Sequence, residues 1–168
     1  AHVRGIDPEC DEARALFRHN EQSLRVVEVI ENGGAGLNLT PEVRDGILHH
    51  TGGERAESYE GRIVAVADRI AYVNHDIDDA IRAGVLRESD LPASTHAVLG
   101  PDHSSRIETL VVDMVETSAR EGDIRMSDAV WSAMMELRAF LFDNVYTSEV
   151  VMEEVAKAMR LIDVLFMY

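Results

Sequence analysis

The chain has 168 residues, of which 46% are hydrophobic and 28% are charged, a composition typical of one folded domain with a sizeable core. Its formal net charge of -15 argues against non-specific binding to nucleic acid or to an anionic membrane, because both would repel an acidic surface. The single cysteine, Cys10, excludes an intrachain disulfide. No apolar run approaches the ~18 residues of a membrane span, and the first residues lack a signal-peptide pattern. We therefore expect a cytoplasmic location.

The N-terminal part of the chain contains a polar segment followed by a predicted helix. Residues 1–16 are polar with weak periodicity, so we interpret them as an N-terminal arm. Apolar residues recur at spacings of three and four over His19–Asn32, which predicts a helix there. His19 and Asn20 fall in its first turn, where the residue types by themselves favour ordinary capping chemistry with Asn20 as the cap.

A second helix is predicted after a glycine-rich loop. The loop, residues 32–39, lacks both the GK[ST] ending and the preceding strand of a phosphate-binding loop, so we reject that interpretation. Thr40 and Pro41 then form a typical helix start, with threonine as the cap and proline at the first helical position. His49 and His50 are expected at the C-terminal end, where the helix dipole favours a cationic imidazole; a role as ligands or substrate contacts is the alternative.

The longest predicted helix is Gly61–Ala83, which contains no proline and has glycine only at its first position. Helical spacing gives it two faces. The apolar face consists of Ile63, Val66, Ala67, Ile70, Ile77 and Ile81, and the second face carries Asp68, Tyr72, His75 and Asp79.

Asp68 is the unusual residue of this helix, because it interrupts a segment apolar enough to be buried. A buried carboxylate is costly unless it is paired, hydrogen-bonded or bound to a cation. Two interpretations follow from the residues alone. Asp68 is either exposed or paired with Arg62 or Arg69, or it is a metal ligand on a core helix with polar neighbours facing the same cavity.

The segment after this helix is mixed and then becomes helical again. A short helix is expected over residues 93–99, and we interpret His96 and His103 as surface residues because neither has a partner at metal-ligand spacing. Ser105 and Glu108 form a capping-box pattern, which predicts that the next helix begins at Ser105 and runs to about Glu121.

Two more helices are predicted in the C-terminal region. Ser127 is expected to cap a helix over residues 128–144, and Thr147 or Ser148 to cap the last one. No strand pattern occurs anywhere, so the sequence predicts an all-α fold. The expected apolar positions of the last helix are Val150, Val151, Val155, Met159, Ile162 and Leu165.

Three segments, Phe17–Glu28, Gly36–His50 and Ala67–Ile81, resemble segments of the bacterial HD-domain deoxynucleoside triphosphate triphosphohydrolases, the dGTPase-like proteins, in the same order. The resemblance implies an HD-domain-like helical bundle, partly present as residues 17–103, and a helical accessory region, residues 104–168. It also implies hydrolysis of a dNTP, with dGTP the expected substrate, to a deoxynucleoside and inorganic triphosphate. A divalent metal such as Mg²⁺ or Mn²⁺ and a homo-oligomeric state are implied as well.

The resemblance also implies roles for particular residues. Asp68 matches the metal ligand, and His19 matches an active-site histidine that donates a proton to the leaving group or positions the triphosphate. Tyr72 and Asp76 match positions of the substrate pocket, where the ring can stack on the sugar and the carboxylate can accept a hydrogen bond from the 3′-hydroxyl. Asn20 is expected to contact substrate. His19, Asp68 and Tyr72 are expected to converge on one cavity.

The chain departs from the family pattern in its first residues. Residues 1–16 lack the upstream histidine, the His-Asp pair and the glycine- and histidine-rich turn of the family. His75 and Asp76 spell the signature, but adjacent helical residues point roughly 100° apart and cannot replace it. We therefore expect part of an enzyme, inactive on its own, without a complete metal site. The alternative is a non-catalytic helical module for nucleotide sensing or interaction.

Overall fold

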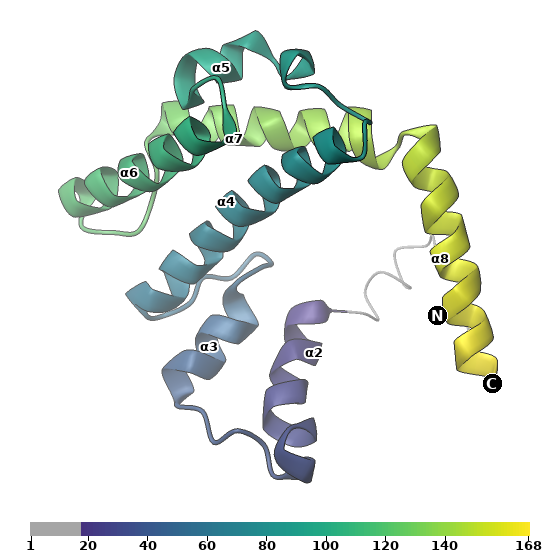
Figure 1. Ribbon diagram of the computed structural model, residues 1–168. Helices are drawn as coiled ribbons and strands as arrows, with labels where there is room; N and C mark the ends of the chain where they lie inside the picture. The colour runs from purple at the N-terminus through teal and green to yellow at the C-terminus, as the bar shows by residue number, and fades with distance from the viewer. Residues whose placement is uncertain (1–17) are drawn as a thin grey trace. The chain divides into compact units, whose positions relative to one another are not determined.

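The computed structural model describes residues 18–168, and all regular structure in that range is helical (Figure 1). No strand occurs among these residues, so the predicted all-α fold is confirmed. The expected N-terminal arm and Cys10 lie outside the described residues. The helices are α2 (His19–Arg25), α3 (Pro41–His49), α4 (Tyr59–Arg82), α5 (Ala93–Leu99), α6 (His103–Glu121), α7 (Asp128–Leu141) and α8 (Glu149–Met167), with π-helical turns at Val26–Ile30 and Phe142–Tyr146 and 3-10 turns at Asn32–Gly34 and Glu88–Asp90.

The chain divides into two compact units, and the boundary lies inside α4, between Asp68 and Arg69. No described helix is both long enough and apolar enough to cross a membrane.

In the first unit, α2 pairs with α3. The N-cap of α2 is Arg18, which makes no side-chain capping bond, so the interpretation of Asn20 as the cap is wrong. α2 continues as the π-helical turn Val26–Ile30 instead of running as one α-helix to Asn32. The chain then turns back through Gly36, whose φ of +74° is in the left-handed region. A Cβ at this position would lie only 2.3 Å from the Glu28 carbonyl oxygen, so the turn requires glycine.

α3 begins as predicted and packs closely against the start of α4. The Thr40 side-chain oxygen accepts a hydrogen bond from the Val43 N–H at 3.4 Å, and Pro41 is the first helical residue. Gly46 of α3 is buried, and a Cβ there would lie 3.4 Å from the Cα of Gly61. Two glycines facing each other therefore let these helices approach, which fixes the last turn of α3 near the loop that precedes α4.

The buried stripe of α4 differs in part from the predicted one. Ile70 and Ile77 are buried as expected, but Ile63 is 40% exposed and Ala67 is exposed as well, so the prediction is wrong for the first half of the helix. In the second unit the stripe instead includes residues that the prediction omitted, namely Val73, Asn74 and Ala80.

Asn74 belongs to a buried polar group that the sequence did not indicate. Arg106 of α6 is fully buried, donates from Nε to Asn74 Oδ1 at 3.3 Å, and pairs through Nη1 with Glu88. Asn74 in turn donates to the Ile70 carbonyl at 2.8 Å. The carboxylate of Glu88 and the amide of Asn74 offset much of the cost of burying this guanidinium, although its Nη2 has no hydrogen-bond partner among residues 18–168. This network joins α4 to α6 in one register.

The apolar core of the second unit lies between α5, α6 and α7, where α5 packs against both other helices (Figure 1). α6 begins earlier than predicted. Its N-cap is Asp102, whose side chain accepts from the Ser105 N–H at 3.0 Å, while the Ser105 hydroxyl accepts from the Asp102 N–H at 3.2 Å. Ser105 is thus the third helical residue of a capping box and not the cap. The fully buried apolar residues of this core are Leu99, Leu110, Met134, Leu137 and Leu141.

His96 and His103 are half-buried, so their interpretation as surface residues is wrong. His103 Nδ1 lies 2.9 Å from Asp78 Oδ2, which links the start of α6 to α4. The buried Nε2 of His96 has no hydrogen-bond partner among residues 18–168.

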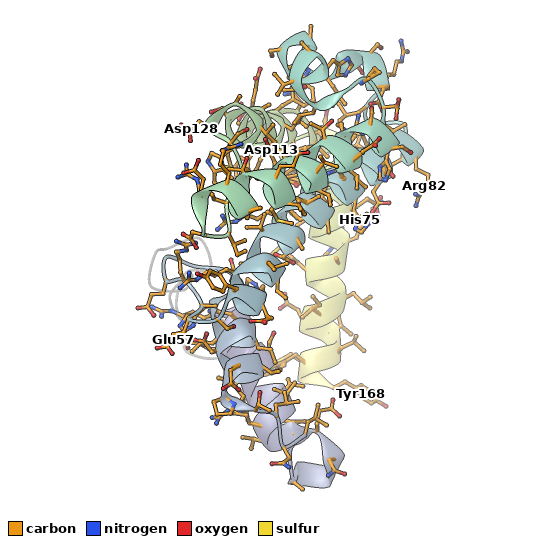
Figure 2. All side chains as sticks on the ribbon, turned by 90° about the vertical axis from the view of Figure 1, so that its left-hand side faces the viewer. Glu57, His75, Arg82, Asp113, Asp128 and Tyr168 are labelled. Carbon is orange, nitrogen blue, oxygen red and sulfur yellow. The ribbon has the colours of Figure 1, made fainter. Side chains whose placement is uncertain are left out.

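The last two predicted caps are correct, but the burial of the last helix is not as expected. The Ser127 and Ser148 side chains accept from the N–H groups three residues on, and α7 gives way to its π-helical turn at Phe142 instead of continuing to Asn144. Figure 2 shows side chains projecting from α8, with Tyr168 at its end. The apolar positions predicted for this helix are exposed except for half-buried Val151, and Leu165 is 68% exposed.

Candidate functional site

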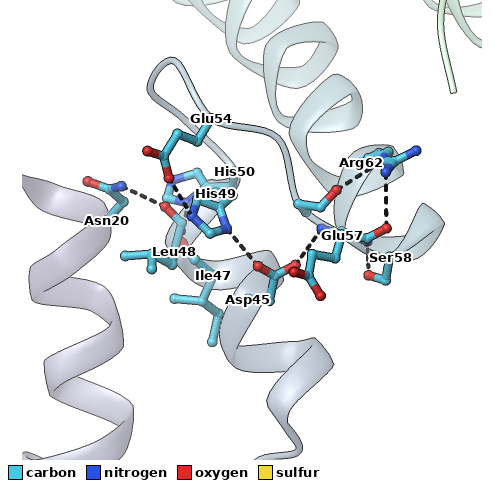
Figure 3. Close-up of polar contacts among 12 residues, drawn as sticks. Asn20, Asp45, Ile47, Leu48, His49, His50, Glu54, Glu57, Ser58 and Arg62 are labelled. Carbon is cyan, nitrogen blue, oxygen red and sulfur yellow. Dashed lines mark hydrogen bonds and ion pairs between the residues drawn. The ribbon is translucent and has the colours of Figure 1, made fainter.

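His19 and Asn20 lie opposite the C-terminal end of α3. Asn20 Nδ2 donates a hydrogen bond to the Leu48 carbonyl at 2.6 Å (Figure 3). The last carbonyls of a helix lack partners within the helix, so this bond both satisfies one of them and holds the first turn of α2 in place. Asn20 therefore has a structural contact, and its expected contact with substrate stays a prediction.

His19 is exposed, and its one described polar partner is another histidine. His19 Nε2 lies 3.2 Å from His50 Nε2, and the two rings meet edge to face with centroids 5.2 Å apart. His50 is half-buried, and its Nδ1 lies 2.7 Å from the Ile47 carbonyl oxygen. His50 is thus held at the end of α3 by a backbone carbonyl, and it lies against His19.

His49, the neighbour of His50, belongs to a different set of contacts (Figure 3). Its Nδ1 lies 2.7 Å from Asp45 Oδ1, and its Nε2 lies 3.3 Å from Glu54 Oε2. The other oxygen of Asp45 accepts from the Glu57 N–H at 2.8 Å, and this bond, together with His49, lowers the pKa of the Asp45 carboxyl. These contacts tie the loop before α4 to α3, so the structure gives His49 a structural role.

A cavity of about 630 Å³ opens beside this histidine pair within the first unit. His50 is one of its polar lining residues, and the apolar part of the lining comes from both α3 and α4. The lining residues are Ser23, Glu42, Val43, Gly46, Ile47, His50, Ser58, Glu60, Gly61 and Val64.

Asp68 is exposed, and it has no hydrogen-bond or ion-pair partner among the described residues. The exposure agrees with one of the interpretations drawn from the residues alone, and the pairing with Arg62 or Arg69 is not found within the described range, because an exposed carboxylate is solvated and needs no partner. Across residues 18–168, no three His, Cys, Asp or Glu side chains lie close enough to hold a metal ion. The described residues do not form a metal site by themselves, and the role of Asp68 as a ligand stays a prediction.

Tyr72 and Asp76, one helical turn apart on α4, are brought together by Tyr146 of the π-helical turn Phe142–Tyr146. The Tyr146 oxygen lies 2.7 Å from the Tyr72 oxygen, and its O–H donates to the Asp76 carboxylate. Burial, followed by these hydrogen bonds to Asp76 and Tyr72, raises the pKa of the Tyr146 hydroxyl, so it remains a donor at neutral pH. Tyr146 is distant from both in sequence, and no spacing pattern could have revealed it.

Comparison with known proteins supports the resemblance stated for the sequence. Residues 124–168 match the family model described as the phosphohydrolase-associated domain, and they lie within the predicted accessory region. The chain is 49% identical over 152 residues to the "Deoxyguanosinetriphosphate triphosphohydrolase-like protein" of Caldanaerobacter subterraneus subsp. tengcongensis, covering 90% of this chain and 45% of the relative.

Two other relatives carry the same description. That of Clostridium perfringens strain 13 is 47% identical over 167 residues, covering 94% of this chain and 48% of the relative. The protein of Bordetella pertussis is 33% identical over 202 residues, covering 89% of this chain and 53% of the relative. The chain therefore spans about half the length of the curated relatives it matches.

Proposed function

We propose that this chain, a homologue of the deoxyguanosinetriphosphate triphosphohydrolase-like proteins, is part of an enzyme that hydrolyses a dNTP, with dGTP the expected substrate. The observation that carries the proposal is the 49% identity over 152 residues to a relative with that description. The Tyr72, Asp76 and Tyr146 cluster adds support, because its carboxylate and hydroxyls suit the recognition of a sugar.

In the proposed reaction, a water oxygen forms a bond to the α-phosphorus, and the bond from this phosphorus to the 5′-oxygen breaks. The bonding electron pair goes to the 5′-oxygen, which would be a poor leaving group as an alkoxide. His19 delivers a proton to this oxygen, and the attacking water loses one to solvent. The products are a deoxynucleoside and inorganic triphosphate, and His19 regains its proton from water.

The proposed sugar contacts are made by Asp76 and Tyr72. Asp76 accepts a hydrogen bond from the 3′-hydroxyl, and the Tyr72 ring stacks on the sugar face. Tyr146 keeps the Asp76 carboxylate oriented by donating to one of its oxygens, which leaves the other oxygen for the substrate. Tyr146 thereby joins the predicted pair as a third residue of the sugar contacts.

The divalent metal is part of the proposal, with Asp68 as one carboxylate ligand. Because the described residues do not supply a complete ligand set, the remaining ligands must come from outside residues 18–168. The same observation favours a second candidate, a non-catalytic module that senses nucleotides or binds a partner. Homo-oligomerisation and a cytoplasmic location stay predictions.

The products distinguish these candidates. We expect the full-length protein, incubated with each of the four dNTPs and Mg²⁺ or Mn²⁺, to release intact inorganic triphosphate and a deoxynucleoside. Phosphorus NMR of the reaction checks this, since triphosphate and pyrophosphate give different spectra. Pyrophosphate with a deoxynucleoside monophosphate would overturn the proposed reaction, and an unchanged spectrum with both metals would favour the non-catalytic module.

The role of Asp76 is tested by a neutral substitution. We expect Asp76→Asn to reduce the preference for a dNTP over its 3′-deoxy analogue by roughly 10-fold or more, because a hydrogen bond to a charged group contributes about 1.5–3 kcal/mol. The turnover number should change less. The measurement is kcat/KM for both substrates, with Asp79→Asn as the control, since Asp79 is exposed on the same helix and paired with Arg82 at 3.1 Å. An unchanged preference would contradict the role.

A further inference from the structure

We propose that His50 is a positioning residue for His19, holding the imidazole so that the proton delivered to substrate resides on Nδ1. The inference rests on the proposed function of His19. The observation behind it is a chain of three groups, in which the Ile47 carbonyl contacts one nitrogen of His50 and the other nitrogen of His50 contacts His19.

The Ile47 carbonyl determines which nitrogen of His50 carries hydrogen. A carbonyl oxygen only accepts hydrogen bonds, so the contact of 2.7 Å requires a hydrogen on His50 Nδ1. A neutral imidazole has one N–H, which leaves His50 Nε2 as an acceptor. The ring is held in this orientation because it is half-buried and lines the cavity between α3 and α4.

His50 in turn determines the orientation of His19. Two nitrogen lone pairs facing each other at 3.2 Å would repel, so His19 Nε2 carries a hydrogen and donates it to His50 Nε2. When His19 is protonated, the second N–H is on Nδ1, and no described residue accepts it. Within residues 18–168, the pair therefore leaves one N–H of His19 without an acceptor, and it is always the one on Nδ1.

An exposed histidine without such a partner can turn its ring over and present either nitrogen. A general acid that donates from one orientation only is more effective when a further group holds the ring, as in other catalytic histidines. His50 supplies this restraint through an uncharged acceptor. His49 does not, because both of its nitrogens face the carboxylates of Asp45 and Glu54.

The first test measures which nitrogen is protonated, independently of activity. Long-range proton–nitrogen NMR of the ¹⁵N-histidine-labelled full-length protein, with signals assigned by His19→Gln and His50→Gln, should show neutral His50 with hydrogen on Nδ1 and neutral His19 with hydrogen on Nε2. Hydrogen on His50 Nε2 would overturn the inference, whether or not the protein hydrolyses a dNTP.

The second test measures kinetics. We expect His50→Leu, which removes the acceptor, to lower kcat by roughly 10–100-fold, the range for groups that orient a functional histidine, with KM within about twofold. His50→Gln should recover most of the kcat, because its amide oxygen can accept from His19. A matched control is His49→Gln, which should keep kcat near that of the parent.

These outcomes separate the inference from the function on which it rests. An active parent with an unchanged kcat in His50→Leu would overturn the positioning role while the proposed function stands. A loss in His50→Gln equal to that in His50→Leu would do the same, since a structural role is not recovered by an acceptor. An inactive parent protein overturns the proposed function, and the NMR measurement then still decides the geometry of the pair.

Discussion

Replacing His19 with alanine is expected to lower kcat of the full-length protein by roughly 10²–10⁴-fold, the usual effect of losing a general acid. The leaving 5′-oxygen would otherwise depart without a positioned proton donor. The fold should be unaffected, because His19 is exposed and its side chain contacts only His50 among the described polar groups. Steady-state kinetics with dGTP, alongside thermal melting of both proteins, measure the two effects.

Gln22→Ala is the matched control for this experiment. Gln22 is exposed in the same helix, and none of the side-chain contacts described for α2 involves it, so its removal should leave kcat within about twofold of the parent, as is usual for such surface changes. Normal turnover by His19→Ala would mean that this histidine is only part of a helix start and that the proton comes from another group.

Replacing Asp68 with alanine is expected to remove bound metal and to lower kcat by roughly 10³-fold or more, because a bound metal contributes several kcal/mol of charge stabilisation in the transition state. We expect the substitution to affect metal binding and turnover without affecting the fold, because the Asp68 side chain is exposed. Asp68 is exposed and unpaired among residues 18–168, so its loss removes no described contact and should hardly change the melting temperature.

Metal content per chain, measured by elemental analysis of the full-length protein, is the direct readout for Asp68→Ala. Asp79→Ala serves as the control, since Asp79 is also an exposed carboxylate on α4. It should retain metal and activity. If Asp68→Ala kept a full complement of metal and normal turnover, Asp68 would be an ordinary surface residue of α4.

The sequence by itself determined the features that depend on neighbouring residues. Thr40, Ser127 and Ser148 cap helices where predicted, because a capping bond joins residues three apart and needs no distant partner. The all-α class followed from uninterrupted helical periodicity, and the similarity to the deoxyguanosinetriphosphate triphosphohydrolase-like proteins followed from three ordered segments.

Tertiary structure decided which face of each helix is covered and which side chains meet. Periodicity along α4 could not show that Asp68 is exposed, because burial depends on the helices that pack against it. The contacts of Arg106 with Asn74 and of Tyr146 with Asp76 join residues far apart in sequence. Likewise, His19 and His50 each lie at a helix end for local reasons, but only the packing of α2 against α3 brings their Nε2 atoms within 3.2 Å.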